Sequence, residues 1–125
     1  MNDRLLARQR ILLVEENTLL FVQYVPAPGT VAVVVAGYAF HGQGAPLNCN
    51  FAMMDAGVET PLSSVAVLGS GTYLQLYTAV PCAKPLIIRG DGQALRFNTP
   101  LKTITKLASL VLVIDEYLGE TAYGH

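Results

Sequence analysis

The sequence predicts an all-β protein, a β-sandwich of jelly-roll type with about eight or nine short antiparallel strands. Three observations predict it: apolar segments recur at regular spacing, Gly and Pro separate them, and β-branched residues dominate several of them. The 125 residues are enough for one domain with one core. We expect an N-terminal arm or short helix at residues 1–10, the sandwich at residues 11–120 and a C-terminal tail at residues 121–125.

The N-terminal segment fits two interpretations. Leucines repeat at heptad spacing within residues 5–13, which would suit a short amphipathic helix. The other interpretation is an extended or disordered arm that reaches a neighbouring subunit. The arginines of this segment are Arg4, Arg8 and Arg10.

The segment Leu19–Phe40 has no charged residue, yet it does not predict a membrane helix. A spanning helix needs about 20 continuous apolar residues, and the "PAPG" sequence in its middle would break it. The valines that follow favour a strand. The sequence therefore predicts a strand at Thr18–Val25, a turn, and a second strand at Thr30–Phe40.

The remaining strands follow from the same signals. We expect strands at Leu47–Met54 and Leu62–Leu68, and a third at Thr72–Val80, where apolar and polar residues alternate most clearly. "LIIRGDGQALRF" predicts a hairpin of Leu86–Arg89 with Gln93–Phe97, because Asp-Gly suits a tight turn.

One or two further strands are expected at Lys102–Lys106 and Leu107–Ile114. His41 would follow a strand as a turn residue.

Charge is scarce and uneven. Charged residues make up 14% of the chain, against roughly 25% in ordinary soluble domains. Between Asn17 and Ala83 the only ones are Asp55 and Glu59. Such a surface predicts an obligate oligomer or a subunit of a larger shell. The alternative is a soluble monomer covered by Ser, Thr, Asn and Gln.

A basic stretch follows, in which five cations oppose Asp91. It could face an acidic partner, or it could be an ordinary solvated surface. Nucleic acid is not expected, because stacking on bases needs exposed aromatics and Phe97 should point inward. The cations are Lys84, Arg89, Arg96, Lys102 and Lys106.

No catalytic or metal-binding motif is visible. His41 has no histidine partner for a metal site, and Ser70 lies between two glycines and does not form a nucleophile elbow. Cys49 and Cys82 are too far apart in the chain for a CxxC motif; two free thiols and one disulfide both remain open. We therefore expect no enzyme activity, no metal and no cofactor.

The strands "SGTYLQLYTAV", "PLIIRGDGQALRFNTP" and "LASLVLVIDEYLG" resemble small β-sandwich structural proteins of tailed bacteriophages, with capsid cement or decoration proteins the nearest type. The resemblance implies a non-enzymatic virion protein, assembled in the host cytoplasm. It also implies a trimer or dimer that bridges major capsid proteins, with neither nucleic acid nor membrane as a partner.

Tyrosines suit protein interfaces and sugar binding alike, so a carbohydrate-binding, lectin-like module is the main alternative function. A different phage head or tail component and a metal-dependent cupin-like enzyme are two further candidates. The candidate contact residues are Arg4, Arg8, Arg10, Tyr38, Tyr73, Tyr77, Lys84, Arg89, Lys102 and Lys106.

Overall fold

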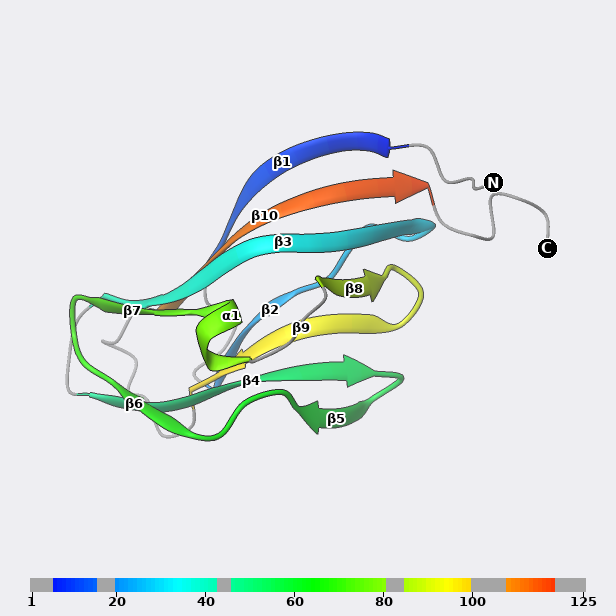
Figure 1. Cartoon of the computed structure of the whole chain (residues 1–125). Helices are drawn as coiled ribbons and strands as arrows, with labels where there is room; N and C mark the ends of the chain where they lie inside the picture. Colours follow the sequence, from blue (N-terminus) through cyan, green and yellow to red (C-terminus); the bar gives the residue numbers. More distant parts are fainter. Residues whose placement is uncertain (1–5, 16–19, 43–45, 81–84, 100–107, 119–125) are drawn as a thin grey trace.

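Two antiparallel sheets pack face to face, which confirms the predicted β-sandwich (Figure 1). The computed structural model describes residues 6–15, 20–42, 46–80, 85–99 and 108–118. The elements are β1 (Leu6–Glu15), β2 (Phe21–Tyr24), β3 (Thr30–His41), β4 (Leu47–Asp55), β5 (Val58–Pro61), β6 (Ala66–Leu68), β7 (Thr72–Gln75), α1 (Leu76–Ala79), β8 (Leu86–Arg89), β9 (Gln93–Asn98) and β10 (Ala108–Leu118).

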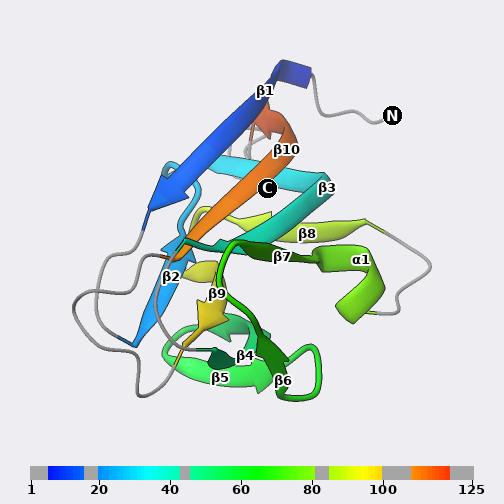
Figure 2. The same ribbon diagram turned by 90° about the vertical axis from the view of Figure 1, so that its left-hand side faces the viewer.

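The strand order is that of a jelly roll. Sheet A runs β1, β10, β3, with β7 and β8 sharing the other edge of β3; sheet B runs β2, β9, β4, with β5 and β6 sharing the other edge of β4. The pairs β1–β10, β2–β9, β3–β8 and β4–β5 are nested, like one long hairpin. Rolled into two layers, this hairpin gives jelly-roll connectivity (Figure 2).

The core lies between the sheets and is made by the inward-facing residues of alternating strands. Leu110, Leu112 and Ile114 of β10 are fully buried, whereas the residues between them are only partly buried. From sheet B, the neighbouring rings of Phe51 on β4 and Phe97 on β9 pack against each other in the core with centroids 5.1 Å apart. Each such side chain contributes about 1.5–3 kcal/mol on burial, so this layer is what holds the sheets together.

The expected strand at Leu62–Leu68 is wrong in its first half. β5 ends at Pro61 and β6 begins at Ala66, because the chain bulges away from β4 between them. Phe51 of β4 would lose its neighbouring strand there, but its N–H donates to the Ser63 hydroxyl oxygen at 2.9 Å. The serine side chain thus replaces a backbone acceptor, which hydrophobic periodicity does not reveal.

The expected strand at Thr72–Val80 stops at Gln75, where the helical turn α1 begins. β7 and β8 both pair with the same edge of β3, so the chain between them must leave that edge. The Tyr77 hydroxyl on α1 donates to the Val34 carbonyl and accepts the Leu86 N–H at 3.0 Å, which holds the departing chain against β3. The alternation of apolar and polar residues continues to Val80, although β8 already pairs with the part of β3 that the last of these residues would need.

The expected hairpin of Leu86–Arg89 with Gln93–Phe97 is also wrong, although both strands form. β8 pairs with β3 in sheet A, and β9 pairs with β2 and β4 in sheet B. Both edges of β9 are therefore occupied, and the glycine-rich turn carries the chain from one sheet to the other.

At the N-terminus the expected boundary at residue 10 falls inside β1. Arg8 to Glu15 pair in continuous register with β10, so this segment is an edge strand and not a helix. His41, expected in a turn, is the last residue of β3 and is fully buried. The expected strand at Lys102–Lys106 and the tail at residues 121–125 lie outside the described residues.

We predict that Gly90→Ala destabilises the fold, because a Cβ at residue 90 would lie 2.0 Å from the Ala27 carbonyl oxygen. The Gly90 N–H also donates to the Thr30 carbonyl at 2.8 Å, so the backbone cannot shift freely. The free energy of unfolding, measured by urea denaturation, should fall by about 1–3 kcal/mol. Gly69→Ala is the control, since its Cβ would meet only Thr72 atoms at 3.8 Å or more. Equal stability of the two variants would contradict the prediction.

Candidate functional site

The outward-facing side chains of sheet A form a broad surface with little charge, which we call the outer face of sheet A. The register places its residues in four rows across the strands. The rows are Gln9–Asp115–Val33–Ile87, Ile11–Val113–Ala36, Leu13–Val111–Tyr38–Gln75 and Glu15–Ser109–Phe40–Tyr73.

Large apolar side chains on this face are open to water. Ile11 is 73% exposed, Leu13 64% and Ile87 48%. The two central rows contain no charged residue, and the carboxylates of the face, Asp115 and Glu15, lie in the two outer rows. Exposed apolar side chains gathered on one face, as here, are typical of protein interfaces.

The outer face of sheet B is polar over β2, β9 and β4, although Val58 and Val67 on its edge strands are exposed. Arg96 donates twice to the Gln23 side-chain oxygen, at 3.0 and 2.8 Å, and its guanidinium lies 3.8 Å from the centre of the Phe21 ring. Asn98 donates to Asn50 at 3.2 Å and to Glu59 at 2.6 Å. This polar network suits contact with water, so the two outer faces of the sandwich are chemically distinct.

Two of the tyrosines selected from the sequence meet on the outer face of sheet A. The rings of Tyr38 and Tyr73 make an edge-to-face contact with centroids 5.2 Å apart. Both are exposed, at 38% and 54%. Tyr77, the third, is half-buried and uses its hydroxyl in the link between α1 and β3, so it lies apart from this pair and as a partner contact remains a prediction.

At one end of β1 a buried carboxylate joins the first strand to the last. Glu116 is 3% exposed, and it accepts hydrogen bonds from Arg8 Nε and, at 2.9 Å, from Arg10 Nη2. Burial opposes its ionisation, but the two guanidinium groups outweigh burial and hold the pKa of Glu116 below its usual value. Burial, followed by the charge of Glu116, raises the pKa of Tyr24 to about 12. The cluster therefore clamps β1 to β10.

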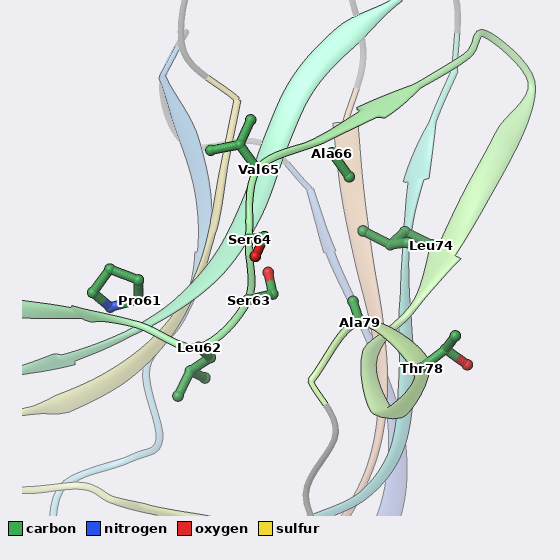
Figure 3. Close-up of a pocket in the computed structure, with 9 residues that line it drawn as sticks. All are labelled: Pro61, Leu62, Ser63, Ser64, Val65, Ala66, Leu74, Thr78 and Ala79. Carbon is green, nitrogen blue, oxygen red and sulfur yellow. The ribbon is translucent and has the colours of Figure 1, made fainter.

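A cleft of about 630 Å³ opens where the bulge after β5 faces α1 and β7. Figure 3 shows Leu74 projecting toward the loop that carries Ser63 and Ser64, while Thr78 points away. Ser63 already binds the Phe51 N–H, and the lining residues include no titratable side chain. The cleft can hold an apolar group, but its own residues supply neither an acid nor a base.

Among the described residues, three further predicted contact residues, Arg8, Arg10 and Arg89, lie apart from the outer face of sheet A. Arg8 and Arg10, expected on an arm, belong to β1 and point toward Glu116. Arg89 is half-buried at the end of β8, and its N–H donates to the Gln93 side chain at 2.9 Å. As partner contacts, all these residues remain predictions. Arg4, Lys84, Lys102 and Lys106 lie outside the described residues.

Other expectations concern metals, thiols and membranes. Cys49 is a buried free thiol whose pKa burial raises to about 11, and Cys82 lies outside the described residues. Among the residues described, no three His, Cys, Asp or Glu side chains gather in a group that could bind a metal. The same part of the chain contains no helix with the length and hydrophobicity to cross a membrane.

Sequence reasoning missed the aliphatic members of the outer face of sheet A, above all Ile11, Leu13, Val111 and Val113. One signal could have found them. In "LVLVI" of β10 and in the valine run of β3, apolar residues occupy both alternating sets of positions. Such a strand has apolar side chains on both faces, which is typical of a sheet covered on both sides.

No protein-family model and no curated protein matches the chain. Among solved structures, a chain from the structure of the Gx strain of infectious bursal disease virus is similar at 8% identity, with a TM-score of 0.31. The match covers 96% of this chain and 45% of that chain, so the protein spans less than half the length of its structural neighbour.

We predict that Glu116→Gln destabilises the fold at neutral pH and changes how stability depends on pH. The folded-state pKa of Glu116 lies below its ordinary value of 4.5. Its ionisation therefore stabilises the fold above that pH, and the contribution is lost as the pH falls through the folded-state pKa. At pH 7 we expect a loss of about 1–3 kcal/mol, less than for a fully buried ion pair because the Arg8 side chain is 59% exposed.

The measurement is urea unfolding of both proteins at pH 7 and at several acidic values. The difference between wild type and variant should shrink as the pH falls below 4.5. Glu15→Gln, at an exposed carboxylate of the same strand as the arginines, should cost less than about 0.5 kcal/mol. A constant difference at all pH values would refute the role of the carboxylate charge.

Proposed function

We propose that the protein is a non-enzymatic structural subunit, a capsid cement or decoration protein of a tailed bacteriophage. It acts in the virion by assembling with copies of itself and bridging major capsid proteins. The observation that carries this proposal is the outer face of sheet A, whose two central rows contain apolar side chains and no charge.

The free energy of removing the apolar area of this face from water is the physical basis of the proposal. Apolar area stabilises a protein by roughly 25 cal/mol for each Å² removed from solvent, and this face leaves such area exposed. Ile11 and Leu13 are the clearest cases, because most of each side chain is open. A protein neighbour would remove this area from water, which an isolated chain cannot do with its own core.

The asymmetry between the two sheets supports the same function. A subunit of a shell needs one surface for protein neighbours and another that faces water. Here the outer face of sheet A supplies the first, and the network of Arg96, Asn98 and Glu59 on sheet B supplies the second. The jelly-roll core between them provides a rigid support.

The test is binding to capsids that lack the protein. We expect the purified chain to co-sediment with such capsids at a saturable ratio and to raise their resistance to heating or osmotic shock. Leu13→Glu should weaken this binding at least tenfold, because it places a charge in a central row. Val67→Glu is the matched control, since Val67 is 70% exposed but lies on β6 of the other sheet.

Absence of binding by wild type to these capsids would refute the cement function. Equal binding by the two variants would show that the outer face of sheet A has no part in it.

Carbohydrate binding is the second candidate, and the exposed Tyr38–Tyr73 pair favours it. Aromatic side chains can stack on sugar rings, and Gln75 lies opposite Tyr38 as a hydrogen-bonding group. A glycan array probed with wild type and Tyr73→Ala tests this function. A glycan bound by wild type and lost in the variant would support it over the structural one.

A further inference from the structure

The outer face of sheet A approaches the size of a stable protein interface. Its four rows lie two residues apart along the strands and cross four strand positions. At about 3.4 Å per residue and about 4.8 Å per strand, the face covers on the order of 500 Å² before side-chain relief is added. Stable interfaces bury about 800 Å² on each partner, so this face supplies most of one.

Its composition follows the pattern of such interfaces, with an apolar centre and a more polar rim. Ile11, Val113 and Val111 lie in the two central rows, and the carboxylates Asp115 and Glu15 lie in the outer ones. The Asp115 carboxylate also accepts a hydrogen bond from the Gln9 amide at 2.7 Å, so it is partly satisfied within the chain.

We propose that a second copy of this chain covers the outer face of sheet A, in a two-fold dimer that packs the two faces against each other. The proposal rests on the proposed function and names the protein neighbour that covers this face: it is a second copy, the dimer meets the capsid through its other surfaces, and Leu13→Glu weakens capsid binding by breaking the dimer. In such a dimer the same patch serves both subunits, so the contact closes and forms no chain of copies.

Three other arrangements fit this chemistry less well. Packing this face on sheet B of another copy would bury the Arg96 and Glu59 network against valine and isoleucine side chains. A strongly charged partner would find no opposite charge in the two central rows. A trimer needs two different complementary patches, whereas one continuous face suits a self-complementary pair.

The known geometry of sheet packing also permits such a dimer. Two sheets stacked face to face lie about 10 Å apart, with strand directions within about 30° of each other, as inside any sandwich. The dimer would then be four layers thick, with the polar network of sheet B on both outer surfaces. This arrangement leaves the polar outer face of each sheet B in water and buries the outer face of each sheet A between the two subunits.

The experiment is the mass of the full chain in solution, measured by sedimentation equilibrium and light scattering over a range of concentrations. Wild type should be a dimer, and Leu13→Glu should weaken dimerisation at least 100-fold. Val67→Glu, the matched control on β6, should remain a dimer. Radical footprinting should show Tyr38, Phe40 and Tyr73 protected in the dimer and reactive in the Leu13→Glu monomer.

Several results would overturn the proposal. One is a wild-type monomer at millimolar concentration; another is a dimer that survives Leu13→Glu. Binding of a wild-type monomer to phospholipid vesicles, lost in Leu13→Glu, would assign the face to a lipid surface. The mass measurement and the capsid-binding assay test different proposals. A dimer that does not bind capsids refutes only the cement function. A monomer that binds capsids refutes only the dimer.

Discussion

The pairing of β3 with β10 is the constraint on which the rest of the structure depends. β3 belongs to the first half of the nested hairpin and β10 is its last strand. Their pairing therefore joins the two halves of the hairpin within sheet A. A register shift between Val113 and Ile114 adds one residue, Val35, on the β3 side. Because the side-chain period of a strand is two, this bulge keeps both ends of β3 with their apolar side chains toward the core.

The same two strands explain the chemistry of the surface. β3 and β10 carry apolar side chains on both of their faces, so when one set fills the core the other set must lie outside. β1 continues this pattern with Leu12 and Val14 inward and Ile11 and Leu13 outward. The exposed face of sheet A is thus a direct consequence of the strands that build the core, and the proposed assembly completes what one chain leaves uncovered.

The buried Glu116 shows how the edge of this sheet is held. β1 has a paired neighbour on one side within the described residues, and its start would be easy to detach without further contacts. The ion pairs of Arg8 and Arg10 with Glu116 supply these contacts at the end of the strand where apolar side chains give way to arginines. Inward-pointing charges on an edge strand also discourage edge-to-edge association, which favours contact through the face instead.

Local pattern in the sequence was enough to determine the β class, the core strands β3, β4 and β10, and the shortage of surface charge, because alternation and β-branching act on neighbouring residues. Tertiary structure decided which strands pair and where each strand ends, because both depend on which strand edges are free. β8 and β9 did not form a hairpin because β9 is paired on both edges. The expected strand could not run on to Val80, because β8 pairs with Val31–Val34, the part of β3 that its last residues would need. The sequence pattern indicates that β3 and β10 are apolar on both faces, but only the register brings Ile11, Val113, Tyr38 and Tyr73 from four strands onto one surface.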